Sequence, residues 1–215
     1  TTFETNFNGT LNILSISTKL KKLQSIVIIT SDKCYQNLNK KNYFIETDPL
    51  GGDDPYSASK GASEILFNSY LKSFFYKKKI GAATARAGNV IGGGDWSVDR
   101  LIPDFLKALD SGEELIIRSP FAIRPWQHVL EPLKGYLQLA ESLIKEGQSF
   151  SEAWNFGPSV KDANTVEFIV KKLIKAFPEA KWGKDVSPQP YETHYLTLDS
   201  TKANRRLSWQ PRWSL

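Results

Sequence analysis

The run SIVIIT, residues 25–30, constrains the fold of this chain most, because such a run is typical of a strand buried on both faces. Apolar residues at helical spacing precede it over residues 1–17 and follow it over residues 54–79. A second strand-like run occupies residues 80–92 and leads into glycines. Because helices and strands alternate, the sequence predicts an α/β fold with a Rossmann-like, doubly wound parallel sheet.

The second half of the chain is less regular and predicts a smaller mixed α/β lobe that binds substrate. Helical patterns and strand-like runs alternate there at residues 100–112, 113–119, 131–147, 153–158, 165–177 and 194–209. We therefore expect residues 1–91 to form the latter part of a dinucleotide-binding domain and residues 92–215 to form mainly the lobe. The helix near 130–147 is expected to pack back on the first domain.

Composition excludes several classes of protein. The only cysteine, Cys34, permits no internal disulfide and favours a reducing cytoplasm. With only His128 and His194 beside it, a tetrahedral zinc site is not expected, and we predict no metal. The net charge of +5 lies in lysine clusters near helix ends, which favours an anionic small molecule over nucleic acid. No apolar run is long enough to cross a membrane.

Five residues suggest chemistry at one edge of the predicted sheet. Ser31, Asp32 and Lys33 follow the first strand directly, and ligands of doubly wound folds gather at the carboxyl ends of strands. Tyr56 and Lys60 are four residues apart and share one face of the next helix. A lysine ammonium near a phenol is expected to lower the phenol pKa, which makes a base for an alcohol proton. The Tyr-x-x-x-Lys pattern alone is weak, and its placement after this strand carries the argument.

Together these residues resemble the extended short-chain dehydrogenase/reductase family, and the resemblance covers essentially the whole chain. The segments ETNFNGTLNIL and RAGNVIGGGD are similar to segments of that family, and the Asp32–Lys33 pair is similar to its nucleotide-sugar 4,6-dehydratases. The dTDP-glucose enzymes carry Thr-Asp-Glu where this chain has Ser31-Asp32-Lys33. The segments TSDKCYQN, GGGDW and RPWQHVLEPLKGYL resemble the CDP-glucose branch.

The resemblance implies a mechanism with NAD as cofactor and CDP-glucose as substrate. Tyr56, helped by Lys60 and Ser31, is expected to take the proton of the sugar 4-hydroxyl while hydride leaves C4 for NAD. Asp32 is expected to act as the acid and Lys33 as the base when water is eliminated across C5 and C6. Those two roles require a raised pKa for Asp32 and a lowered pKa for Lys33. Burial shifts each pKa in the required direction, whereas the opposite charges of the adjacent pair oppose both shifts.

Further expectations also come from the resemblance. Tyr56 and Lys60 are expected to contact the cofactor. A homodimer is expected to form through the helices 1–19 and 57–76. The G-x-G-x-x-G fingerprint of the family does not occur in these 215 residues, so we expect the chain to lack the N-terminal portion of its dinucleotide-binding domain. The residues expected to bind the sugar nucleotide are Asn89, Arg100, Arg124 and Glu192, with Arg124 on the diphosphate.

Three alternatives stay open at this level. A dTDP- or UDP-sugar 4,6-dehydratase or a 4-epimerase shares most of these features. A non-catalytic dinucleotide-sensing module on the same fold has no need of Asp32, Lys33, Tyr56 and Lys60 together. An inactive fragment is the third alternative.

Overall fold

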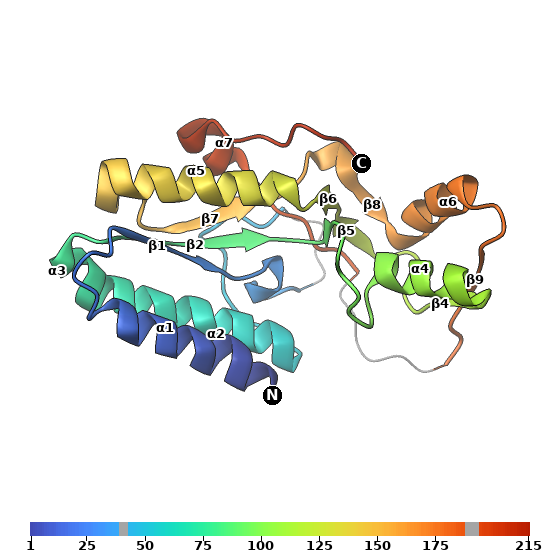
Figure 1. The fold of residues 1–215 in the computed structure, drawn as a ribbon, viewed down its shortest axis with the longest axis horizontal. Coiled ribbons are helices and arrows are strands. Elements are labelled where there is room, and N and C mark those ends of the chain that lie inside the picture. Colours follow the sequence, from blue (N-terminus) through green and yellow to red (C-terminus); the bar gives the residue numbers. More distant parts are fainter. Residues whose placement is uncertain (39–42, 188–193) are drawn as a thin grey trace.

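A three-stranded parallel sheet forms the centre of the larger part of the molecule (Figure 1). The computed structural model describes residues 1–38, 43–187 and 194–215. The strands β1 (Ser25–Ile29), β2 (Gly81–Ala87) and β7 (Ala153–Phe156) lie in the order β1-β2-β7. The expected parallel sheet of an α/β fold is confirmed, and its first strand occupies the SIVIIT run.

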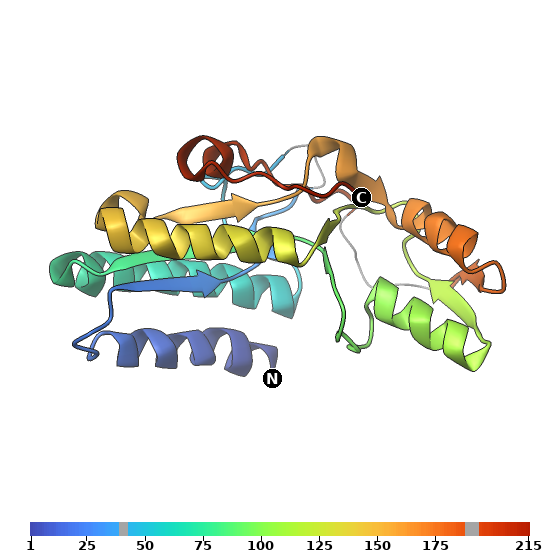
Figure 2. The same cartoon turned by 45° about the horizontal axis from the view of Figure 1, so that its top comes forward.

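Helices cover both faces of this sheet, as Figures 1 and 2 show. On one face lie α1 (Gly9–Ser17) and α2 (Pro55–Tyr70), and on the other lies α5 (Leu130–Glu146). Small residues of β2 let both layers approach closely. Ala82 packs with Leu14 and Phe67 on the first face, whereas Ala83 and Ala85 pack with Leu139, Leu143 and Trp154 on the second.

The helix α2 begins where its sequence satisfies the first free N–H groups. Asp54 is the cap, and its Oδ1 accepts hydrogen bonds from the N–H groups of Tyr56 at 2.9 Å and Ser57 at 3.0 Å. Pro55, which has no N–H to donate, occupies the first helical position. The helix continues through a π-helical segment, Leu71–Phe75, and α3 (Tyr76–Lys78). The cap therefore fixes Tyr56 in the first turn of α2.

The strand expected over residues 80–92 is interrupted. β2 ends at Ala87, and β3 (Val90–Ile91) pairs instead with β6 (Gln127–His128). The break lies at Gly88, where a Cβ atom would meet Pro125 Cγ at 2.3 Å and Asp32 Oδ2 at 2.7 Å. Only glycine fits such a close approach, and the chain leaves the sheet there.

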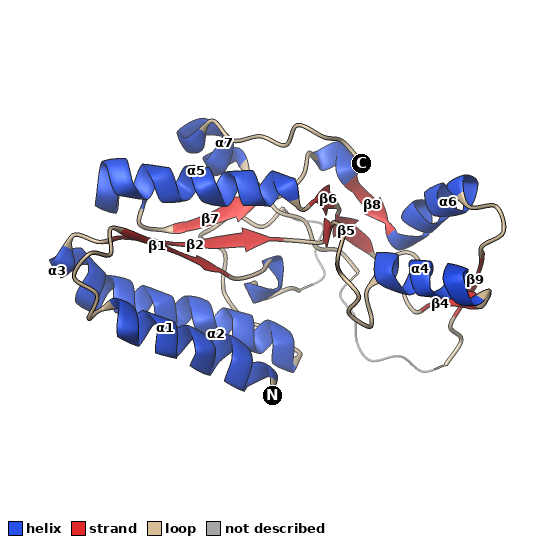
Figure 3. Cartoon of the chain, in the orientation of Figure 1, coloured by secondary structure: helices blue, strands red, loops and turns tan. Residues whose placement is uncertain are grey.

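A smaller group of elements lies beyond the carboxyl ends of the sheet strands, at the right of Figure 3. It comprises α4 (Leu101–Ser111), β4 (Glu114–Ile117), α6 (Val166–Ala176) and β9 (Lys181–Lys184). Its core contains Phe105, Leu115, Ile117 and Val170. β5 (Ile123–Pro125) and β8 (Ala163–Thr165) pair antiparallel between this group and the sheet.

The carboxyl end of the chain returns to the larger part. Residues 194–199 form isolated bridges, Ile123 with Tyr195 and Phe44 with Leu198, in place of a regular strand. The last helix, α7 (Thr201–Leu207), buries Leu207 in the core cluster on the α5 face. Across the described ranges, each helix is too short or too polar to span a lipid bilayer.

Candidate functional site

The turn that comes after β1 is held by its own side chains. Ser31 has an extended backbone, with φ −164° and ψ 158°, and caps a 3-10 turn over Asp32–Cys34. Its Oγ accepts a hydrogen bond from Lys33 N at 3.2 Å and donates one to Asp32 Oδ1 at 2.9 Å. The serine hydroxyl and the carboxylate are therefore fixed relative to each other.

Asp32 is buried, and one of its two carboxylate oxygens accepts the hydrogen bond from Ser31. Within the described part of the chain, its Oδ2 has no hydrogen-bond partner. Burial raises the pKa of this carboxyl to about 6, against the opposing hydrogen bond from Ser31 and the charge of Lys33. The expected direction for Asp32 is confirmed. Its carboxyl is able to carry and release a proton near neutral pH.

Tyr56 lies against Ser31, but the shift of its phenol pKa is opposite to our expectation. Burial raises the pKa of Tyr56, although 42% of the residue's surface is exposed. A hydrogen-bonding interaction with the Ser31 side chain and the charge of Arg100 oppose that rise. The prediction that Lys60 lowers the phenol pKa below its ordinary value of about 10 is therefore wrong for this structure.

Lys60 lies beside Tyr56. Its Nζ is 5.8 Å from the centroid of the Tyr56 ring, as expected for residues one helical turn apart. Burial lowers the pKa of Lys60, against the charges of Cys34 and Glu64. Lys60 therefore lies beside the tyrosine but does not line the cavity at the carboxyl ends of β1 and β2.

A cavity of about 730 Å³ lies at the carboxyl ends of β1 and β2. It brings together residues from the turn after β1, the start of α2, the break after β2 and the start of α4. The residues predicted from the sequence that line it are Ser31, Asp32, Lys33, Tyr56, Asn89 and Arg100. Six of the nine predicted site residues therefore share one cavity.

A second cavity, of about 320 Å³, continues from the first, and both include Asn89, Asp99 and Trp126 in their walls. Arg124 lines the second cavity and exposes only 4% of its surface, and its Nη1 donates a hydrogen bond to Ile123 O at 3.0 Å. The remaining predicted binding residue, Glu192, lies outside the described residues.

Sequence reasoning missed Arg118. It follows β4, lines the second cavity, and its Nη2 lies 3.3 Å from Asp99 Oδ1. The available signal was an arginine directly after the strand-like run EELII, but only the position of β4 shows that it faces the cavity.

The chain was compared with known proteins. A family model described as GDP-mannose 4,6 dehydratase matches residues 1–215. A CDP-glucose 4,6-dehydratase of Salmonella typhimurium is 49% identical over 220 residues, which cover 100% of this chain and 61% of that protein. A dTDP-glucose 4,6-dehydratase of Streptomyces griseus is 26% identical, over 96% of this chain and 60% of that protein. The chain thus spans about three fifths of the length of these relatives.

Solved structures of lower identity share the fold. A dTDP-glucose 4,6-dehydratase of Streptomyces venezuelae, solved with NAD, superposes with a TM-score of 0.82 at 22% identity, over 99% of this chain and 62% of that one. A UDP-glucuronic acid 4-epimerase of Bacillus cereus, also solved with NAD, gives 0.84 at 20% identity, over 98% and 64%. These similarities establish the Rossmann-type arrangement of the sheet and its helices.

Proposed function

Since the chain belongs to the family described as GDP-mannose 4,6 dehydratase, we propose that its protein removes water from a nucleotide hexose and forms a 4-keto-6-deoxy sugar. We further propose CDP-glucose as the substrate, on the basis of the 49% identity with the Salmonella typhimurium enzyme along this entire chain. The observation that carries the proposal is the shared cavity of Ser31, Asp32, Lys33 and Tyr56. This shared cavity supports the proposal because a base for an alcohol and an acid for a leaving hydroxyl must both reach one sugar ring.

NAD is the proposed cofactor, and the residues present fit its reactive end. The cavity lies at the carboxyl ends of parallel strands, where doubly wound folds bind dinucleotides, and it is walled by Tyr56 and Gly88. When bound there, NAD would accept hydride from C4 of the sugar and return it to C6. We propose that Tyr56 and Lys60 hold this end of the cofactor.

The first chemical role belongs to Tyr56. Its phenolate is proposed to accept the proton of the 4-hydroxyl, with Ser31 orienting the phenol oxygen. Because burial raises the pKa of Tyr56, the phenolate must be favoured by the loaded site.

The second role belongs to the neighbouring pair. Asp32, with a pKa of about 6, is proposed to donate a proton to the departing 6-hydroxyl from its unpartnered Oδ2. Lys33 is proposed to remove the C5 proton. Replacing Lys33 with Met is expected to abolish exchange of the C5 hydrogen with solvent deuterium, and unchanged exchange would remove Lys33 from the mechanism.

Binding and assembly complete the proposal. Arg124 is proposed to bind the diphosphate, because a guanidinium matches phosphate oxygens in pairs, and Asn89, Arg100 and Glu192 are proposed to contact the sugar nucleotide. A homodimer is proposed through α1 and α2, which lie side by side and expose Ile13 and Ile65. We place the protein in the cytoplasm, on the basis of its free thiol and its substrate class.

The decisive experiment supplies CDP-glucose or dTDP-glucose to the intact protein with NAD. A 4-keto-6-deoxy product, which absorbs in alkali, is expected from CDP-glucose in preference to dTDP-glucose. Tyr56→Phe is expected to lower the rate by about 10²- to 10⁴-fold. Tyr70→Phe is the matched control, because Tyr70 is on the same helix as Tyr56 but away from the cavity. This change removes a 2.8 Å hydrogen bond with Ser15 of α1. An epimer without the alkaline absorbance would overturn the proposal.

A further inference from the structure

A buried carboxylate, Glu64 on α2, holds two neighbouring strands. Its Oε1 accepts hydrogen bonds from Thr30 Oγ1 at 2.5 Å and Arg86 Nε at 2.8 Å. Its Oε2 accepts from Thr84 Oγ1 and from Arg86 Nη2, both at 2.8 Å. Glu64 and Arg86 each expose only 3% of their side chains. One carboxylate therefore ties α2 to β1 through Thr30 and to β2 through Thr84 and Arg86.

The two threonines differ in their distance along the chain from the reacting groups. Thr30 directly precedes Ser31, and its N–H donates to Ala85 O at 2.9 Å, which continues the β1–β2 ladder by one residue. Thr84 lies within β2, three residues before the strand ends at Ala87. The Thr30 hydroxyl is thus the side-chain attachment of the strand nearest to Ser31 and Asp32.

The same network also contacts the residue that follows the turn and the helix that carries Tyr56 and Lys60. Arg86 Nη1 donates to Tyr35 Oη at 2.8 Å, and Tyr35 comes directly after the turn Asp32–Cys34. Glu64 is one helical turn after Lys60, and its charge acts against the lowering of the Lys60 pKa by burial. The network therefore contacts the residues that flank the turn on both sides and holds the helix that carries Tyr56.

We propose that Thr30 is a positioning residue of the dehydratase site: its hydrogen bond to Glu64 sets the placement of Ser31 and Asp32 relative to Tyr56 on the same α2 helix. The inference rests on the proposed function for its kinetic consequence. Removing the hydroxyl leaves a lone pair of a buried carboxylate unmatched and removes the side-chain attachment of the strand end. Misplacement by about 1 Å costs up to about 10²-fold in rate. The loss is expected in the chemical step and not in substrate binding.

The test compares Thr30→Val with Thr84→Val in the intact protein. Each variant replaces a hydroxyl with a methyl group, and each removes one hydrogen bond to the same carboxylate, so a purely structural role predicts similar losses. We expect Thr30→Val to lower kcat by about tenfold or more with little change in KM, and Thr84→Val to lower kcat by less than about twofold. Thermal unfolding of both variants measures their shared structural cost. Equal falls in kcat, or no fall in either variant, would overturn the inference.

A second readout does not depend on turnover. Crystal structures of both variants are expected to show Ser31 and Asp32, which remain joined by their hydrogen bond, displaced relative to Tyr56 in Thr30→Val and unmoved in Thr84→Val. An undisturbed Ser31 in Thr30→Val would refute the positioning role even if the substrate proposal is correct. Conversely, an unmodified protein that converts no nucleotide hexose would refute the proposed function and leave this structural comparison to decide the role of Thr30.

Discussion

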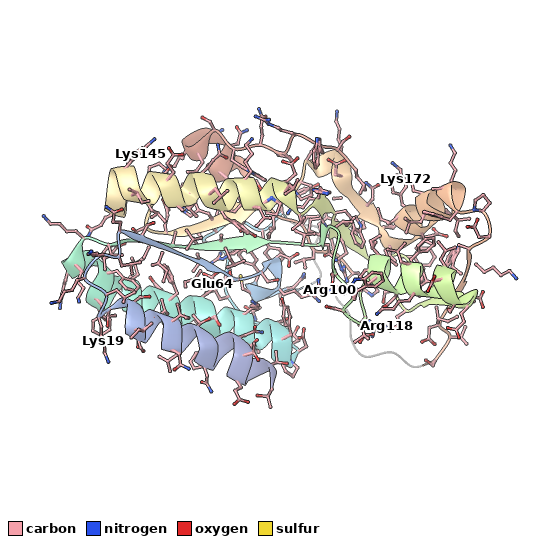
Figure 4. The ribbon with its side chains drawn as sticks, in the orientation of Figure 1. Lys19, Glu64, Arg100, Arg118, Lys145 and Lys172 are labelled. Atoms are coloured by element: carbon pink, nitrogen blue, oxygen red, sulfur yellow. The ribbon has the colours of Figure 1, made fainter. Side chains whose placement is uncertain are left out.

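The ion pair between α2 and the sheet differs from the ion pairs around the cavities; Figure 4 labels Glu64 in the first region and Arg100 and Arg118 in the second. Glu64 and Arg86 form a bidentate pair at 2.8 Å in which each side chain is 3% exposed. At the cavities, Arg118 and Asp99 lie 3.3 Å apart with side chains 47% and 73% exposed. Arg100 lies 3.6 Å from Asp95 and is also largely exposed.

This difference distinguishes a buried ion pair that holds the fold from exposed ion pairs whose arginines are available to bind a ligand. A buried pair with all its hydrogen bonds satisfied holds one geometry, because any other arrangement leaves a charge without a partner. Exposed pairs contribute only about 0–1 kcal/mol, so their arginines are able to exchange a protein carboxylate for an anionic ligand at little cost. The site therefore combines rigid reacting groups with adaptable binding groups.

Breaking the buried pair is expected to have the largest effect. Arg86→Ala leaves the Glu64 charge buried without its bidentate partner, and we expect it to lower the free energy of unfolding by about 3–5 kcal/mol. Arg118→Ala is the matched control and is expected to cost less than about 1 kcal/mol. Urea unfolding of the two variants measures both values. A similar small cost in both variants would contradict the contrast between the two regions.

Asp32 tests an intermediate case, since it is buried like Glu64 but has one unpartnered oxygen. Its folded-state pKa of about 6 exceeds the unfolded value of about 3.9, so its contribution to stability is present below pH 4 and is lost as pH rises through 6. Asparagine has no carboxyl group to ionise, so the Asp32→Asn variant does not lose this stability as pH rises. Relative to the unmodified protein, we expect the variant to gain about 2 kcal/mol of unfolding free energy between pH 4 and pH 8.

Urea unfolding across that pH range measures this gain. Asp110→Asn, on the exposed side of α4, is the control and is expected to show no pH-dependent gain. A gain of the same size in both variants would assign the effect to net charge. A flat difference for Asp32→Asn would contradict the raised pKa.

The smallest effect is expected at the exposed pair. Asp99→Asn removes the carboxylate that faces Arg118, and asparagine tolerates the left-handed backbone of this position, where φ is 61°. We expect CDP to bind up to about fivefold more tightly, because Arg118 no longer exchanges one anion for another. Titration calorimetry with CDP measures the change, again with Asp110→Asn as the control. Unchanged or weaker binding would show that Arg118 does not face the ligand.

Local patterns were sufficient for the elements that carry the reacting groups. The Ile and Val run of β1 and the strand-end rule were enough to place Ser31 and Asp32 beside Tyr56. The strand expected to extend to residue 92 was wrong, because Gly88 meets Pro125, a residue 37 positions later for which the local sequence has no signal. The contact of distant segments, and not the propensity of residues 88–92, ended the strand.

Properties that depend on burial were predicted less well. The acid role expected for Asp32 requires a raised pKa, and burial supplies it, whereas the direction for Tyr56 was wrong because we considered the charge of Lys60 and neglected burial. Arg118 was missed because the place of β4 beside the cavity depends on packing among Phe105, Leu115 and Val170. Sequence therefore located the groups but not their electrostatic surroundings.

The close packing around Gly88, where the chain leaves β2, limits which positions of the cavity wall can be changed by protein engineering. The Asp32 carboxyl after β1 and the Pro125 ring on β5 both lie where a Cβ atom of residue 88 would be. A single methyl group at position 88 would therefore clash with both, so the acid or the proline would have to shift. Library designs that diversify the cavity wall should therefore keep this position fixed and vary its neighbours.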